Sequence, residues 1–351
     1  MQPPNVGGIS AEFMFDASRA MAIQWGGKPR SPGSASIFCL AAAVALAFLA
    51  VAAVEADEPG KDGADDDVYR LYPTFESLPG VDSQDIRHLW TTGIRAEGRG
   101  DFLSAARVYE QIARRLPEDS HAYWRTGRAY WQVGEYLPSN DKAERIRYFT
   151  LTKKWATDGL AVNPKCGECC LYRFAGISRL ATARGLFTAI RYAKEMAELL
   201  DRGIALHPTH SDNEWNMELG NLYYAASHLY RLMPDWLWLR WILGVCGDRE
   251  RALDYARKAH EITPIRIDYS VALGAALLCV GTEEGDQESI TEGIAVLREA
   301  ARLPRLRYRD DSLFLEHAQK LIAEPDEACT YSPDGWIDVE GTLAAEKGAQ
   351  H

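Results

Sequence analysis

The sequence has little that points to catalysis. It contains no H-E-x-x-H metal motif, no G-x-S-x-G nucleophile motif and no glycine-rich loop of the kind that holds a phosphate. Its acidic residues are many, yet none forms an isolated pair in an apolar setting, as a general acid and base would require. The sequence therefore indicates a protein that is not an enzyme and that has no cofactor and no metal.

Positive charge is also in short supply. Lysine and arginine number 39 against 50 aspartates and glutamates, which gives a formal net charge of −11 over 351 residues. A surface that binds phosphate needs a basic excess, so the charge balance argues against nucleic acid as a partner.

Alternating strand patterns are missing as well, whereas helical periodicity runs from Ser83 onward. Hydrophobic residues make up 47% of the chain, which is enough for a sizeable core. We therefore expect an all-α fold.

One long apolar run, residues 37–54, lies near the N-terminus. Lys28 and Arg30 precede it, and Val54-Glu55-Ala56 follows it with small residues at the positions that a signal peptidase reads. We interpret residues 1–56 as a leader with a signal peptide, which predicts a periplasmic or secreted protein. The alternative is an uncleaved membrane anchor formed by residues 37–54, which would then supply the membrane contact.

Composition separates the rest of the chain into three segments. Residues 57–80 have little to bury, which is typical of an acidic linker. Residues 81–325 carry the helical periodicity and form the expected folded domain. Its last helix is predicted from Asp311 to Ala323, and residues 326–351 are expected to be an irregular C-terminal tail.

The clearest pattern in the folded region is a pair of helices with small residues where they meet. Leu219-Gly220 is followed by Ala252, Ala256 and Ala259, whose spacing of four and three places them on one helix face. Pro264 ends that second helix, because proline cannot continue the hydrogen-bond ladder.

The same order of residues occurs earlier in the chain, at Gly93, Ala105, Tyr109 and Pro117. These spacings resemble those of the tetratricopeptide repeat, a helical hairpin of about 34 residues. The resemblance implies a tetratricopeptide-like α-solenoid of about five helical hairpins over residues 81–325, closed by a C-terminal capping helix.

A narrower resemblance is to bacterial relatives of the regulator-of-microtubule-dynamics proteins and to the tetratricopeptide subunits of periplasmic tripartite transporters. It is carried by Gly185 to Leu206, Leu219 to Tyr224 and Ala252 to Pro264. The resemblance implies an adaptor or a ligand-binding role, and neither group has a catalytic residue set to carry over.

Cys166, Cys169 and Cys170 form the sharpest local cluster. A C-x-x-C pair can be a structural disulfide, half of a zinc site or a redox-active pair. The haem-attachment motif fails because residue 170 is cysteine rather than histidine, and the sequence has no second C-x-x-C to complete a zinc site. We expect a structural disulfide or a buried thiol, with metal binding and redox activity as alternatives.

Two further stretches resemble sites. His207 and His210 have metal-like spacing, but they lie at a helix end, and we expect a solvated loop there. Trp236, Trp238 and Trp241 lie in an insertion within the clearest repeat. We expect this apolar insertion to be buried over its hairpin, and the alternative is an exposed patch for a membrane or a partner.

The first helix of each tetratricopeptide hairpin lines the concave face, where solenoids bind their partners. Counting from the glycine of each repeat, the inward positions include Trp90, Trp124, Arg128, Trp131, Arg173, Asn221 and Tyr224. We therefore expect an exported, non-enzymatic scaffold that binds a protein or peptide on this face. The alternatives are a small-molecule-binding accessory subunit of a periplasmic transporter and a thiol redox protein.

Overall fold

The structure is a computed structural model that describes residues 75–210, 217–306 and 308–337. All of these residues belong to one compact unit, residues 61–351. The predicted signal peptide or anchor in residues 1–56 lies outside the described residues. Within the described ranges, no helix is both long and apolar enough to cross a membrane.

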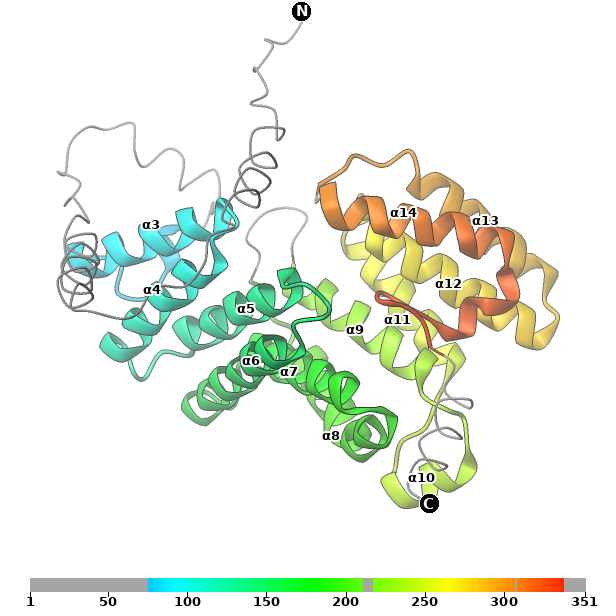
Figure 1. Ribbon diagram of the computed structural model, residues 1–351, viewed down its shortest axis with the longest axis horizontal. Coiled ribbons are helices and arrows are strands. Elements are labelled where there is room, and N and C mark those ends of the chain that lie inside the picture. Colours follow the sequence, from blue (N-terminus) through cyan, green and yellow to red (C-terminus); the bar gives the residue numbers. More distant parts are fainter. Residues whose placement is uncertain (1–74, 211–216, 307, 338–351) are drawn as a thin grey trace, which may run out of the picture. The chain divides into compact units, whose positions relative to one another are not determined.

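Helical hairpins follow one another along the described chain (Figure 1). The pairs are α3 (Gln84–Gly98) with α4 (Phe102–Arg115), α5 (Ser120–Tyr136) with α6 (Lys142–Val162), α7 (Gly167–Arg184) with α8 (Leu186–Ala205), α9 (Glu218–Leu232) with α11 (Arg249–Ile262), and α12 (Ile267–Glu284) with α13 (Gln287–Ala300). The first helices α5, α7, α9 and α12 also pack on one another in that order. The chain is therefore the all-α helical repeat that the spacings predicted.

Local sequence explains where the second helices begin. Asp101, Asp248 and Asp286 precede α4, α11 and α13, and each side chain accepts a hydrogen bond from a backbone N–H of the first turn. Such a cap stabilises a helix by about 1 kcal/mol. In these three hairpins, an aspartate at the end of the turn therefore caps the second helix.

The packing residues of the clearest repeat lie as the sequence predicts. Ala252, Ala256 and Ala259 are fully buried on one face of α11. A Cβ atom added at Gly220 would lie only 3.0 Å from the hydroxyl of Tyr269, so α9 approaches α12 closely at this point. The predicted capping helix is α14 (Tyr308–Ala323), which packs on α12 and α13.

The folded region begins earlier than expected. Residues Phe75–Ser77 form a 3-10 helix, and Phe75 and Leu78 are buried with the core of the first hairpin. The indole N–H of Trp90 donates to the carbonyl of Pro79 at 2.9 Å. The prediction that the acidic linker runs to residue 80 is therefore wrong at its C-terminal end, because these few apolar residues cover the open end of the stack.

The expected irregular tail also contains ordered structure. A 3-10 helix, η3 (Pro325–Thr330), leads into the antiparallel strands β1 (Tyr331–Ser332) and β2 (Gly335–Trp336). Tyr331 is buried, and a disulfide joins Cys329 to Cys279 of α12. The prediction of an irregular tail is therefore wrong up to residue 337, because one buried ring and one covalent bond hold this short segment.

The tryptophan-rich insertion connects α9 to α11 and contains α10 (Leu237–Leu243). Trp236 is partly buried, but Trp241 is exposed, and the side chain of Trp238 lies outside what the structure describes. The prediction of a buried insertion is therefore wrong for Trp241. Apolar composition alone did not show that α10 stands clear of the hairpin it was expected to cover.

Replacing Gly176 with alanine tests the close approach of α6 and α7. The added Cβ would lie 2.7 Å from the backbone nitrogen of Lys153, so we expect Gly176→Ala to lower the free energy of unfolding by about 1–3 kcal/mol. Gly127→Ala is the matched control, because its nearest heavy atom is 3.4 Å away and alanine favours a helix by up to about 1 kcal/mol. Urea unfolding followed by circular dichroism measures both, and equal effects would contradict the close approach.

Candidate functional site

A chain of charged and polar side chains runs along the first helices of the hairpins. We call it the inner network, and its members are Glu97, Arg125, Arg128, Tyr172, Glu218, Asn221, Arg266, Asp268 and Tyr269. Most of these side chains are buried, which is unusual for charged groups unless they are paired.

Arg128 of α5 is the centre of the inner network. Its Nε and Nη2 atoms donate to Glu97 Oε1 at 2.9 and 2.6 Å, and its Nη1 atom donates to Glu218 Oε1 at 3.3 Å. Arg125 donates to the other oxygen of Glu97 at 3.0 Å. One guanidinium therefore joins the first hairpin to the fourth.

Glu218 extends the inner network toward the C-terminus. It accepts hydrogen bonds from the hydroxyl of Tyr172 at 3.0 Å and from the side-chain amide of Asn221 at 3.1 Å. The carbonyl oxygen of that amide accepts from Arg266 and from the hydroxyl of Tyr269, both at 2.8 Å. The contacts thus form a continuous path from α3 to α12.

The charges of the inner network balance, because Glu97, Glu218 and Asp268 match its three arginines. Each carboxylate is bonded to at least one guanidinium. Burying a charge costs several kcal/mol unless a partner compensates it, so every member depends on the others. Every carboxylate of the network is thus engaged by a guanidinium, and the network forms a structural clamp between hairpins.

An aromatic cluster lies beside this clamp. Trp124 stacks on Tyr172 with ring centroids 5.9 Å apart, and the ring of His210 lies 4.7 Å from Trp124. A ring nitrogen of His210 is 3.3 Å from Arg125. His210 is therefore partly buried against α5, and the prediction of a solvated loop is correct for His207 alone.

The predicted binding residues divide into three groups. Trp90, Trp124 and Arg128 are buried, so the prediction that they line an open face is wrong. Arg173 pairs with Glu195 of α8 at 2.6 Å and so faces its own hairpin.

Trp131, Asn221 and Tyr224 form the third group, and all three are half-buried on first helices. Asn221 belongs to the inner network, and Tyr224 stacks on Tyr269 at 5.3 Å. The repeat spacing located the first helices correctly, but it could not show that neighbouring helices cover the row that faces them.

Sequence reasoning missed Glu97, Arg125, Glu218 and Arg266 altogether. A signal for two of them was present, because Arg125 lies two residues from the packing Gly127 and Glu218 lies two residues from the packing Gly220. A charge this close to a buried helix contact must find a partner there. The partners themselves come from other hairpins, 28 to 90 residues away in the chain.

The C-terminal segment, residues 325–337, is held by two further arginines of the first helices. Arg231 of α9 donates to the carbonyl oxygens of Ala328 and Cys329, at 2.5 and 3.4 Å. Its other terminal nitrogen contacts His228 Nδ1 at 3.0 Å. Burial without a carboxylate partner among the described residues lowers the pKa of Arg231 to about 10.

Arg179 of α7 holds the turn of the same segment. It forms ion pairs with Glu135 of α5 and with Asp334, which lies between β1 and β2. The first helices therefore bind a stretch of their own chain through backbone carbonyls at one end and a carboxylate at the other.

The structure joins Cys166 and Cys169 in a disulfide, and both sulfurs lie in the core. Cys170 is a buried free thiol, and desolvation raises its pKa to about 11. A thiol that resists ionisation is a poor nucleophile. A candidate metal cluster among the described residues, Cys279 with Glu283 and Cys329, has its two sulfurs bonded to each other.

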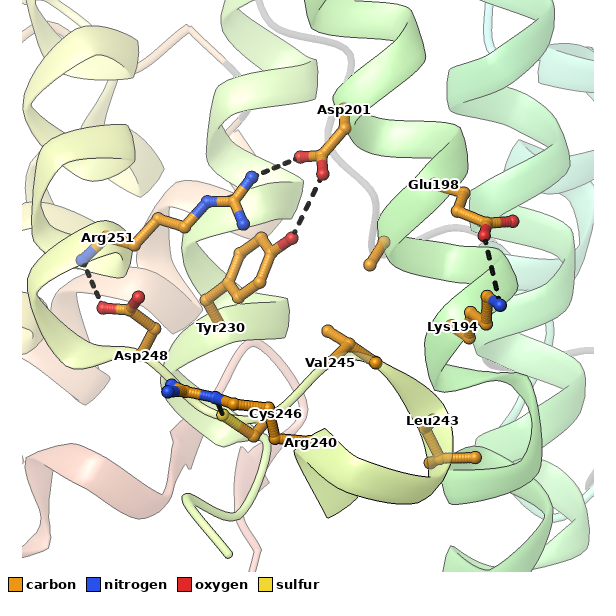
Figure 2. Close-up of a pocket in the computed structure, with 12 residues that line it drawn as sticks. Lys194, Glu198, Asp201, Tyr230, Arg240, Leu243, Val245, Cys246, Asp248 and Arg251 are labelled. Carbon is orange, nitrogen blue, oxygen red and sulfur yellow. Dashed lines mark hydrogen bonds and ion pairs between the residues drawn. The ribbon is translucent and has the colours of Figure 1, made fainter. Parts of the chain in front are cut away.

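A cavity of about 270 Å³ lies between α8, α9 and the connection to α11 (Figure 2). Arg251 pairs with Asp201 at 2.6 Å, and Lys194 lies 3.8 Å from Glu198. The volume is below the range of about 300–1,000 Å³ that is usual for small-molecule sites. Because these charges are already paired, the cavity offers a ligand little to bind.

Glu218→Gln tests whether the inner network is a structural clamp. Removing one buried negative charge leaves Arg128 and its neighbours with an uncompensated positive charge, so we expect a loss of about 3–5 kcal/mol in the free energy of unfolding. Glu292→Gln is the control, because its pair with Arg257 is exposed and is worth about 1 kcal/mol or less. Urea unfolding at neutral pH measures both, and a loss no larger than that of the control would show that the clamp is unimportant.

Because of the buried His228, we expect the free energy of unfolding to fall in mildly acidic solution. Burial, and then the charge of Arg231, hold its pKa well below the ordinary value of 6.5. Below that ordinary value the unfolded chain binds a proton that the folded chain does not, so stability is full at higher pH and falls as the pH drops.

We expect His228 to contribute a slope of about 1.4 kcal/mol per pH unit below about pH 6.5. His228→Gln should remove this part of the slope in urea unfolding measured at several pH values. The exposed His88 provides the control, and His88→Gln should leave the slope unchanged. A slope that is the same in both variants would contradict the assignment.

Two solved structures have a low similarity to the chain. A thermophilic TPR protein of Thermus thermophilus has 14% identity and a TM-score of 0.46, over 67% of this chain and 100% of that chain. The MamA protein has 15% identity and a TM-score of 0.35, over 62% of this chain and 94% of that chain. No curated protein matches the chain.

The family model described as Regulator of microtubule dynamics protein 1-3 matches residues 94–324. This range takes in all five hairpins apart from the start of α3, and also the capping helix. It is about two thirds of the chain, and the resemblance to the regulator-of-microtubule-dynamics proteins is confirmed. The chain therefore belongs to the family of regulator of microtubule dynamics proteins 1-3.

Proposed function

We propose that the chain is a non-enzymatic scaffold that binds a protein or peptide segment along the first helices of its hairpins. The observation that carries the proposal is the binding of residues 325–337 by Arg179 and Arg231. These arginines already bind backbone carbonyls of the 3-10 helix η3 and the carboxylate of Asp334 in the turn that follows it. A partner segment needs the same two kinds of contact.

The place that the proposal favours is the face of α5 beside the C-terminal segment. Trp131 is half-buried there, one helical turn before Glu135, which pairs with Arg179. A tryptophan ring supplies a large contact area at low entropic cost, and it is often an anchor of protein interfaces. Of the seven binding residues predicted from the sequence, we therefore retain Trp131 as a partner contact.

The inner network supports a role without catalysis. Its carboxylates are bonded to guanidinium groups, and a base must be free to accept a proton. The buried disulfide between Cys166 and Cys169 gives a partner thiol no access, which disfavours thiol exchange. The small cavity with its paired charges gives no support to the transporter-accessory alternative.

We further place the scaffold outside the cytoplasm, as a periplasmic or secreted protein or one anchored by residues 37–54. Two features support this location, the leader pattern in the sequence and the two disulfides, Cys166–Cys169 and Cys279–Cys329. Structural disulfides are typical of oxidising compartments and rare in the cytosol of mesophiles.

A photo-crosslinking amino acid tests the binding face. We expect the full chain with benzoylphenylalanine at Trp131 to form crosslinks to another protein when it is illuminated in its native cells. The control is the same substitution at Lys154, an exposed residue of the second helix α6. Mass spectrometry identifies the products, and adducts at both positions, or at position 131 only to the chain itself, would contradict the proposed face.

A further inference from the structure

The connection between α9 and α11, residues 233–248, is much longer than the other hairpin turns. Those turns occupy residues 99–101, 137–141, 185 and 285–286. The long connection carries α10, and Figure 1 shows α10 beyond the ends of α9 and α11. The hairpin does not need this added element for its packing. An added surface element of this kind is a candidate for binding a partner.

The two ends of this connection are fixed to each other. The backbone N–H of Gly247 donates to the carbonyl of Pro234 at 2.9 Å, and that of Asp248 donates to the carbonyl of Tyr230 at 3.0 Å. A Cβ atom at position 247 would lie 2.0 Å from the carbonyl oxygen of Met233, so only glycine fits. The two points at which the connection leaves and rejoins the hairpin are therefore held in fixed positions, and α10 lies between them.

The tip of α10 is apolar and exposed. Trp241 is 88% exposed and Ile242 is 72% exposed, and Arg240 beside them is also exposed. The next most exposed large apolar side chains among the described residues are Leu313 at 44% and Tyr136 at 42%. Leaving side chains of this size in water forgoes about 1.5–3 kcal/mol each relative to burial, so the tip is a marked exception.

The area of the tip decides between possible partners. A tryptophan buries about 150–250 Å², so the two side chains together offer roughly half of the 800 Å² that each partner of a stable protein interface usually buries. A bilayer needs no complementary surface, and tryptophan favours the boundary between headgroups and acyl chains. We propose that Trp241 and Ile242 insert into the interfacial layer of a lipid membrane.

The position of the apolar run in the sequence favours the same partner. Residues 55–74 separate that run, residues 37–54, from Phe75, the first described residue. A stretch of this length spans at most about 70 Å when fully extended. A chain held in a membrane by residues 37–54 thus keeps the domain close to the bilayer, where even a weak second contact is occupied by virtue of its high effective concentration.

A fluorescent label at the tip tests the inference in the full chain. Ile242→Cys carries an environment-sensitive nitrobenzoxadiazole label, and Leu313→Cys, also at an exposed apolar position, is the matched control. Both chains also carry Cys39→Ser, because residue 39 lies in the apolar run and its thiol would take up the label. The remaining native cysteines do not compete, since Cys170 and Cys246 are buried and the other four are in disulfides. Circular dichroism checks that both labelled chains keep the helical content of the unmodified protein.

With phosphatidylcholine vesicles, we expect the emission at position 242 to rise several-fold and to shift to shorter wavelength. Spin labels on the acyl chains should quench this emission, and Trp241→Ser in the same chain should reduce the rise. Position 313 should show neither change. This readout reports insertion of the tip itself, so attachment of the chain through residues 37–54 alone leaves position 242 unchanged.

Two results would overturn the inference. The first is an unchanged spectrum at position 242 when the full chain is bound to vesicles. The second is a shift that occurs without lipid and grows with protein concentration, which would show that the tip meets a second copy of the chain. Neither result bears on the crosslinking test at Trp131, so the two proposals stand or fall separately.

Discussion

A buried positive charge that must be neutralised is the constraint on which the arrangement of the hairpins depends. Arg128 can be buried only because Glu97 comes from the first hairpin and Glu218 from the fourth. Small residues such as Gly176 let the helices approach, but apolar packing tolerates a range of positions. The ion pairs have much narrower geometric limits, and so they determine how hairpins that are distant in sequence meet.

The repeat pattern and the inner network differ in how far the sequence reveals them. Gly220 and Ala252 belong to a local pattern that repeats, and their packing roles could be read from spacing. Two partners of Glu218, Arg128 and Tyr172, lie on α5 and α7, and nothing in the spacing of one hairpin specifies a residue on another. For the same reason Trp90 and Trp124 were located on the correct helices and assigned to the wrong environment.

The two ends of the domain were misjudged for a related reason. Composition describes averages over many residues, whereas the ends are held by a few buried side chains, such as Phe75 with Leu78 and Tyr331 with Ala328. Trp241 shows the opposite error, because the apolar composition of its stretch predicted burial and its side chain is exposed. The features that distinguish this chain from a generic helical repeat therefore depend mostly on individual large side chains and not on the average composition of a segment.

The disulfide between Cys279 and Cys329 has a consequence for the order in which the stack comes apart. It encloses α13 and α14 in a covalent loop whose ends lie on α12 and on the C-terminal segment. The segments that follow α12 therefore cannot separate from α12 as a free end. A protease that cuts the turn at Gly285 would leave two pieces that still travel as one molecule until the bond is reduced.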